Sequence, residues 1–192
     1  MSPTPGCGSP EGSGQACSAS PHTRSAIVEA QWTAERRALE RPWTEQPTYS
    51  VLTPGHRTRC AAHLRPPRLR RPVPQPLAGG WLSGRYRKDE QSRPAATARP
   101  QNRFDLSLPE NQRKLDAAEA LAQLADRAGI TLIELAIAFV LRHPAITSAI
   151  IGPRTMGHLE SQLTATEVQL THDVLDAIDT IVGPGVTLNP RR

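Results

Sequence analysis

The chain contains few aromatic residues, few cysteines and no long apolar run. Aromatic residues make up 4% of its 192 residues, and its three cysteines stand far apart at positions 7, 17 and 60. This spacing excludes a Cys-x-x-Cys metal site and a disulfide framework. The sequence contains no stretch of 18 apolar residues, so it predicts no membrane span. Because no basic segment followed by an apolar one opens the chain, we expect no signal peptide and a cytoplasmic location.

Lysine is also scarce, and acids are missing from one basic tract. Only Lys88 and Lys114 contribute lysine to the 23 basic residues, and the formal net charge is +5. Residues 56–71 hold six arginines and no acid. The tract lacks interleaved aromatics and resembles no nucleic-acid-binding module. We therefore expect no specific nucleic-acid partner, although unspecific attraction of polyanions follows from the charge.

The first half of the chain is rich in proline and weakly patterned. Residues 1–24 are rich in Gly, Ser and Pro and predict disorder. Residues 25–42 predict an amphipathic helix that Pro42 ends. Residues 48–52, TYSVL, predict a short buried strand. The segment 56–75 carries prolines that argue against a helix or a central strand, at positions 66, 67, 72 and 74.

The second half is patterned clearly after a Gly-rich turn at 76–86. A helix is expected from Pro109 to a stop at Gly129, with an apolar stripe at Leu115, Ala118, Leu121, Leu124 and Ala125. Thr131 and Glu134 predict a capping box for a second helix that is apolar nearly all round. A last helix is expected after Thr171. Helices alternating with strand candidates indicate an α/β fold.

The run AIIGPRTMGHLESQL at 149–163 is the most informative segment. A strand candidate, 146–151, leads to Gly152 and Arg154, and a short helix begins near Thr155. A helix start offers unpaired N–H groups, and arginine adds a planar, permanently charged fork. Together these features predict a phosphate-binding turn.

Several segments of the chain resemble the aldo-keto reductase family. They are residues 25–55, the turn PLAGGWLSGRY at 76–86, and the segment from about residue 103 to 190, which includes this run. The resemblance implies an NADP(H)-dependent oxidoreductase of aldehydes and ketones built as a (β/α)₈ TIM barrel. Such a barrel takes roughly 250 residues. We therefore expect an incomplete C-terminal portion, a fragment, with residues 1–24 disordered, 25–55 a helix and strand, 56–75 anomalous and 76–190 the C-terminal barrel portion.

The resemblance also implies positions for the cofactor. Gln46 would bind the nicotinamide carboxamide, and the backbone at Leu77 and Gly79 would follow the pyrophosphate. Arg85 matches the basic residue beyond that loop. Gly152 and Arg154 match the site of the adenosine 2′-phosphate, and His158 and Gln162 stand nearby at positions that contact the adenine. His158 departs from a frequent Gln, and Ser161–Gln162 depart from an acid followed by Asn.

The family's catalytic Asp, Tyr, Lys and His lie on strands that have no counterpart in this sequence. No catalytic residue is therefore assigned, and no metal site is expected. The parent family acts on small carbonyl substrates, and an N-terminal half encoded upstream is one partner that would supply the missing groups. Three readings follow: an inactive reductase fragment, a non-catalytic nucleotide- or polyanion-binding module, and a translated pseudogene remnant.

The segment 56–75 fits a frameshift. Codons can be chosen for residues 56–63, HRTRCAAH, so that the shifted frame reads IERDVLP, a sequence ordinary for the family at this place. We interpret 56–75 as bounded by two compensating shifts, which put proline at position 74 where the family places an aromatic that stacks on the nicotinamide.

Overall fold

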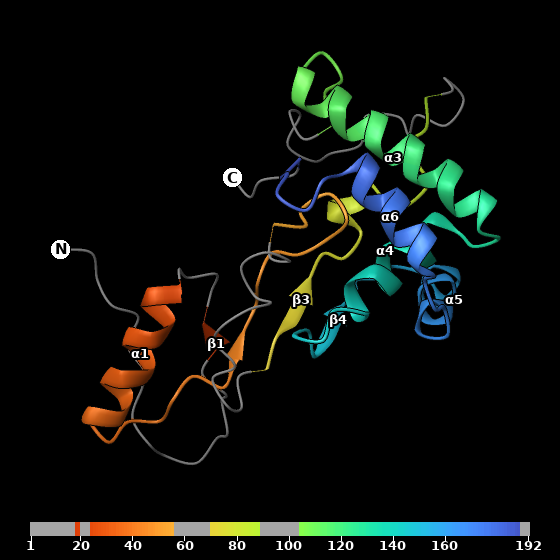
Figure 1. Cartoon of the computed structure of the whole chain (residues 1–192). Coiled ribbons are helices and arrows are strands. Elements are labelled where there is room, and N and C mark those ends of the chain that lie inside the picture. Colours follow the sequence, from red (N-terminus) through yellow and green to blue (C-terminus); the bar gives the residue numbers. More distant parts are fainter. Residues whose placement is uncertain (1–17, 20–23, 56–69, 89–103, 189–192) are drawn as a thin grey trace.

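The computed structural model describes residues 18–19, 24–55, 70–88 and 104–188. Within these residues the strands are short, and most residues in helices or strands are helical (Figure 1). The arrangement is an α/β fold with few strands.

The described strands form two pairs, and the strands of each pair run parallel. β1 (Ser18–Ala19) pairs with β2 (Thr44–Glu45), and β3 (Pro72–Pro74) pairs with β4 (Ser148–Ile150). An isolated parallel bridge between Thr44 and Arg70 links the two pairs. These two parallel pairs, β1-β2 and β3-β4, are consistent with an incomplete (β/α)₈ barrel.

The proline-bearing tract, whose prolines argue against a helix or a central strand, ends in a strand, β3, that pairs with β4. Val73 is the one residue of β3 with a backbone N–H, and it is fully buried. Arg70 exchanges backbone hydrogen bonds with Trp43 and Glu45 on one side, whereas the carbonyl of Arg71 accepts from Thr147 on the other. Because backbone groups alternate along a strand, the two prolines face the side of β2, where pairing has already ended. The two prolines, which lack a backbone N–H, therefore stand where no hydrogen bond between strands is needed.

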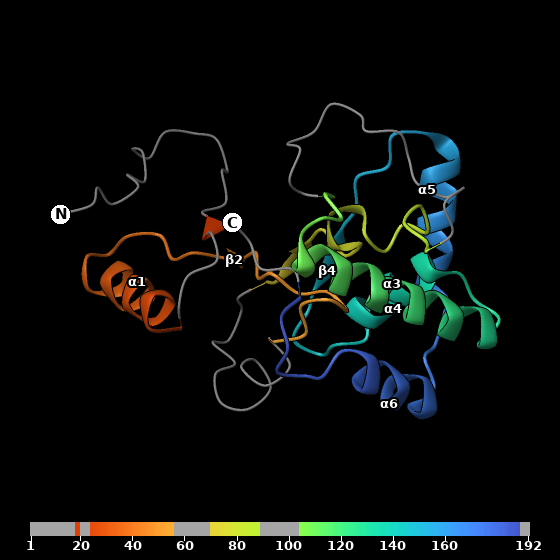
Figure 2. The same ribbon diagram turned by 90° about the horizontal axis from the view of Figure 1, so that it is seen from above.

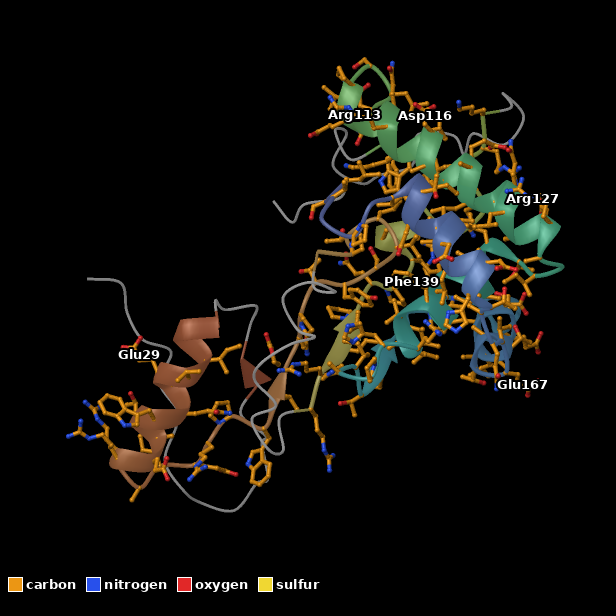
Figure 3. All side chains as sticks on the ribbon, in the orientation of Figure 1. Glu29, Arg113, Asp116, Arg127, Phe139 and Glu167 are labelled. Carbon is orange, nitrogen blue, oxygen red and sulfur yellow. The ribbon has the colours of Figure 1, made fainter. Side chains whose placement is uncertain are left out.

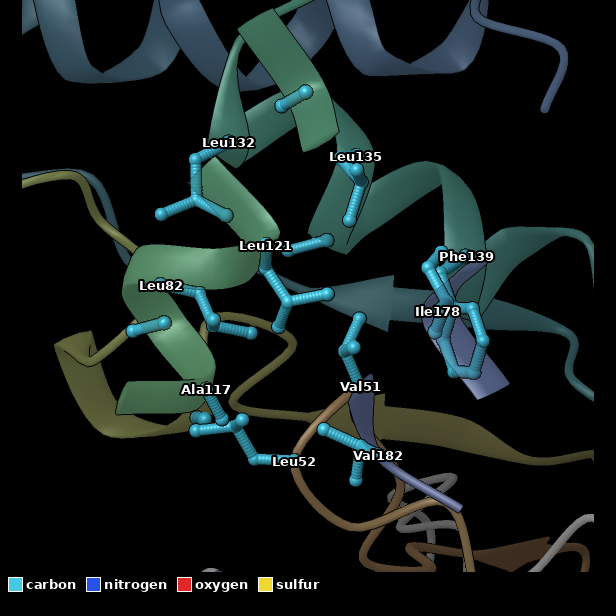
Figure 4. Packing of buried hydrophobic residues seen from close by; sticks show 14 of the residues in the cluster. Val51, Leu52, Leu82, Ala117, Leu121, Leu132, Leu135, Phe139, Ile178 and Val182 are labelled. Carbon is cyan, nitrogen blue, oxygen red and sulfur yellow. The ribbon is translucent and has the colours of Figure 1, made fainter. Parts of the chain in front are cut away.

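Two helices form the centre of the core, as their apolar patterns predicted. α3 (Pro109–Arg127) begins with proline in its first turn, and Gly129 follows it with a φ of 70°. α4 (Leu132–Leu141) begins with the predicted capping box of Thr131 and Glu134. The predicted stripe of α3 is buried, and seven residues of α4 are buried. Figure 4 shows Leu121, Leu135 and Phe139 in one cluster with Val51 and Leu82.

The C-terminal helices cover this centre. α5 (Met156–Leu163) packs on α4 and continues into a 3₁₀ turn, η3 (Thr164–Thr166). α6 (His172–Ile181) packs on α3 and buries Leu175 and Ile178 (Figure 2). Both α5 and α6 have a threonine N-cap whose side chain accepts a backbone N–H, at Thr155 and Thr171.

The predicted helix at 25–42 is shorter than expected. α1 (Arg24–Arg36) ends six residues before Pro42, and Ala38 takes a left-handed φ of 52°. Ile27 and Ala34 are buried, whereas Leu39, which lies within the range expected to be helical, is 54% exposed. Figures 1 and 3 show α1 beside the strands rather than within the helical core.

Two further expectations for the first half are wrong. Residues 48–52 do not form a strand, because Ser50 and Thr53 close a tight turn through mutual backbone hydrogen bonds. Their apolar side chains are nevertheless buried, with Val51 and Leu52 fully enclosed. Ser18–Ala19, expected in a disordered segment, form β1, since they pair with Thr44 and Glu45. The rest of 1–23 and the arginine tract 56–69 lie outside the described residues.

A search of the described helices finds none with the length and apolarity needed to cross a membrane.

Candidate functional site

Three of the predicted cofactor positions come shortly after the carboxyl ends of three strands. Gln46 follows β2, the turn from Leu77 follows β3, and Gly152 follows β4. Because the strands are parallel, their carboxyl ends lie at one rim of the sheet. This is the rim where barrel enzymes place their binding loops.

The turn after β3 is shaped by left-handed backbone conformations. Ala78, Gly79 and Gly80 have φ values of 50°, 72° and 109° in the 3₁₀ turn η1 (Ala78–Gly80). The N–H of Gly80 donates to the carbonyl of Leu77 at 2.9 Å. Glycine at positions 79 and 80 lets the chain take this path without the strain that a Cβ would add.

An aromatic cluster anchors the end of this turn to the core. Trp81 is fully buried, and its ring lies 5.2 Å from Tyr86 and 5.1 Å from Phe104 between ring centroids. Tyr86 and Phe104 stack at 4.4 Å with planes 10° apart. The ammonium of Lys114, from α3, lies 5.8 Å from the centre of the Trp81 ring. The Gly-rich turn is thereby fixed at its C-terminal side by packing.

An ion pair holds the chain just beyond that cluster. The Arg87 guanidinium donates two hydrogen bonds of 2.9 Å to the carboxylate of Glu119 on α3. The Arg87 hydrogen bond lowers the pKa of Glu119, which burial by itself would raise; the backbone N–H of Lys88 lowers it further. Paired hydrogen bonds of this kind fix orientation as well as distance. Arg85 therefore lies in a segment that is fixed by Trp81 on its N-terminal side and by Arg87 on its C-terminal side.

The turn after β4 presents its charge to solvent. Gly152 and Arg154 are exposed, and no atom comes within 4 Å of a Cβ built on Gly152. The hydroxyl of Thr155 accepts the backbone N–H of His158 at 3.2 Å and so begins α5. The arrangement is the predicted one: a bare turn, a guanidinium and a helix start within four residues.

The structure brings two of the predicted residues into contact from distant parts of the sequence. Arg85 Nη2 lies 2.9 Å from His158 Nε2. Arginine has donors only, so the histidine nitrogen is the acceptor. The loop after β3 and the helix after β4 therefore meet through Arg85 and His158.

The other predicted positions are placed differently. Gln46 is half-buried beside Glu45, and no described contact joins it to Arg85 or Arg154. Gln162 is 8% exposed on α5, so its side chain lies in the packed interior rather than on the rim surface. Leu77 is half-buried at the start of η1.

A buried ion pair near the rim was not predicted. Glu45 and Arg71 bond at 3.1 Å, with side chains 8% and 13% exposed, and join β2 to the residue before β3. One arginine of the basic tract is thus occupied inside the protein rather than available to polyanions. No local pattern in the sequence signals this pair, because 26 residues separate its partners.

The tyrosines of the described region serve packing. Tyr49 is 2% exposed and stacks on Phe139 at 5.5 Å, and Tyr86 belongs to the aromatic cluster. Within the ranges that the structure describes, no three His, Cys, Asp or Glu side chains gather as metal ligands would.

Comparison with known proteins gives a consistent result. A family model described as "Aldo/keto reductase family" matches residues 23–182. The "Uncharacterized oxidoreductase YrpG" of Bacillus subtilis is 32% identical over 160 residues, which are 83% of this chain and 46% of the relative. The "Probable voltage-gated potassium channel subunit beta" of Arabidopsis thaliana is 30% identical over 81% of this chain and 48% of its own length. "Protein tas" of Escherichia coli is 30% identical over 55% of this chain and 30% of the relative. The chain thus spans about half the length of the first two.

Proposed function

Because the chain belongs to the aldo/keto reductase family, we propose that it carries part of the NADP(H) site of an oxidoreductase acting on small aldehydes and ketones. The observation that carries this proposal is the contact of Arg85 with His158, which joins the loop after β3 to the helix after β4. The family generally uses NAD(P)H. The residues present fit such a group, since the rim offers cations and a bare glycine turn.

In this proposal the rim holds the cofactor from one end to the other. Gln46, with an amide that both donates and accepts, binds the nicotinamide carboxamide. The backbone at Leu77 and Gly79 lies along the pyrophosphate. Arg85, Gly152 and Arg154 hold the adenosine 2′-phosphate, and His158 orients Arg85 from the side. Gln162 supports α5 from within and does not contact the nucleotide directly, since its side chain is buried.

When bound, the nicotinamide supplies a hydride for carbonyl reduction. The chain's own contribution is binding and orientation, because proton donation to a carbonyl needs a positioned acid of suitable pKa. Tyr49 is enclosed in the core and Tyr86 is stacked on Phe104, so neither stands ready for that task. We therefore assign no catalytic residue and propose that this chain alone does not reduce carbonyls.

Calorimetric titration of the full chain with NADPH and with NADH tests the cofactor site. We expect NADPH to bind more tightly, and Arg154→Ala to weaken NADPH about tenfold to hundredfold, as loss of a charged hydrogen bond of about 1.5–3 kcal/mol implies. NADH affinity should change little. Arg142→Ala, which removes another exposed arginine at the end of α4, is the matched control.

Equal affinities for the two nucleotides, or equal effects of Arg154→Ala and Arg142→Ala, would contradict the assignment. Catalysis is tested separately by following NADPH absorbance with an aldehyde present. We expect no oxidation above the rate without protein, and turnover by the purified chain would show that it contains a proton donor.

A further inference from the structure

The contact between Arg85 and His158 joins two side chains that can both carry a positive charge. Arg85 is exposed, His158 is half-buried, and Arg85 Nη2 lies 2.9 Å from His158 Nε2. Arginine stays protonated and has donors only, so the contact needs an imidazole that accepts through Nε2. A protonated His158 would instead place a second cation against the guanidinium. The free protein therefore keeps this hydrogen bond only while His158 is uncharged.

No acidic side chain of the described region balances these two residues. Neither Arg85 nor His158 forms an ion pair with a described carboxylate. Other cations of the described region do pair with a carboxylate: Arg41, Arg71, Arg87 and Lys88. The place where the loop after β3 meets α5 is thus basic and left without a counter-charge from the described chain.

The charged groups around His158 come from few elements. α5 packs on α4 and on η3, which has no charged residue. The charged residue of α4 is Glu134, whose carboxylate accepts from the N–H and the hydroxyl of Thr131. α5 itself carries Glu160, but residues two apart on a helix do not face each other, and Arg154 precedes the helix. An anion beside the His158 ring must therefore come from a ligand.

We infer that binding of NADP(H) is coupled to the uptake of a proton by His158. The inference rests on the proposed function, which places the adenosine 2′-phosphate at Arg85. In the bound state Arg85 donates to the phosphate, which carries about two negative charges. Nε2 of His158 no longer accepts from Arg85 and takes a proton from the solvent. The imidazolium then stands beside an anion, which favours its charged form.

This coupling would make the choice of nucleotide depend on pH. A ligand that binds with proton uptake binds more tightly as the pH falls through the range in which histidine titrates. NADH lacks the 2′-phosphate and should show no such dependence at His158. Glutamine, which is frequent at this position in the resembling family, cannot gain a charge. His158 therefore gives this chain a stronger preference for NADP(H) at acid pH than glutamine would give.

Calorimetric titration of the full chain with NADPH at neutral pH, in two buffers of different ionisation enthalpy, measures the proton uptake. We expect the wild type to take up more protons per bound NADPH than His158→Gln. The phosphate also titrates, with a pKa of about 6, but it does so in both proteins and cancels in the comparison. From pH 8 to pH 6, the preference for NADPH over NADH should rise about threefold to tenfold more in the wild type than in His158→Gln.

His172→Gln is the matched control, because it removes another exposed histidine from the first turn of a helix, α6. We expect this variant to take up as many protons as the wild type. Circular dichroism shows whether each variant is folded. Nitrogen NMR of the wild type gives a readout that needs no variant: both imidazole nitrogens of His158 should be protonated with NADPH bound, and only Nδ1 with NADH bound.

The possible failures are distinguishable. Equal proton uptake by the wild type and His158→Gln overturns this inference and leaves the cofactor site in place. An imidazole of His158 that stays neutral when NADPH is bound does the same. A chain that binds no NADPH at all overturns the proposed function, and this inference with it.

Discussion

Arg85 and His158 are 73 residues apart in sequence, yet Arg85 Nη2 lies 2.9 Å from His158 Nε2. Arg85 lies beyond the turn that follows β3, and His158 is in the first turn of α5. The contact therefore links the two loops that the proposed nucleotide would join. For Arg85 to donate this hydrogen bond, the Nε2 atom of His158 must carry no proton, because arginine has donors only.

The first prediction concerns this contact. Neutral His158 should carry its proton on Nδ1, and nitrogen NMR of the imidazole should report that tautomer in the wild-type protein and lose the preference in Arg85→Ala. In a double-mutant cycle on NADPH affinity, Arg85→Ala and His158→Ala should couple by about 0.5–1 kcal/mol. Arg85→Ala combined with Arg142→Ala should instead be additive. Additivity in both cycles would show that the contact does not support binding.

The second prediction concerns acid stability. The pKa of Glu119 is lowered from its ordinary value of 4.5, mainly by the hydrogen bond from Arg87. A carboxyl group with a depressed pKa stabilises the folded state above its unfolded pKa, and this contribution is lost as the pH falls below 4.5 toward the folded value. Glu119→Gln should lower the free energy of unfolding by about 1–2 kcal/mol at pH 7 and flatten its decline at acid pH.

Urea titrations between pH 7 and pH 3 provide the measurement for Glu119. Asp116→Asn is the control on the same helix, because the Asp116 side chain is 62% exposed and pairs with Lys88, whose side chain is 57% exposed. We expect the control to follow the wild-type curve. If both variants shift the curve equally, the bidentate contact with Arg87 has no special role.

The third prediction concerns the capping box of α4. Thr131→Ala removes the hydroxyl that accepts the N–H of Glu134 at 3.2 Å and should lower the free energy of unfolding by about 1 kcal/mol. Thr180→Ala, at an exposed site within α6, should change it by less than about 0.5 kcal/mol. Both values come from urea unfolding at pH 7, and a smaller effect for Thr131 than for Thr180 would show that the cap contributes nothing.

The fourth prediction concerns the buried pair that joins β2 to β3. Arg71→Ala leaves the carboxylate of Glu45, 8% exposed, without its guanidinium. Removing one partner of a buried pair typically costs about 3–5 kcal/mol. The double change Arg71→Leu with Glu45→Met should recover much of this loss, since no buried charge then remains. A double variant as unstable as Arg71→Ala would indicate that packing rather than charge sets the effect.

The helical half of the fold was predictable because its signals are local. The stripe on α3, the stop at Gly129 and the box of Thr131 with Glu134 each depend on residues within one or two turns of helix. The threonine caps of α5 and α6 follow the same rule. The strands were harder: residues 48–52 have strand-like composition, but the bonds between Ser50 and Thr53 close a turn there instead.

The sequence by itself determined the α/β class, the family and the helices that build the core, because periodicity and capping act between neighbours in the chain. Tertiary structure decided that β3 pairs despite Pro72 and Pro74, that Gln162 is buried, and that Arg85 reaches His158. Each of these depends on which distant segments pack together. Strand register and cross-chain contacts are set by burial and by backbone hydrogen bonding over the whole domain, which no short stretch of sequence encodes.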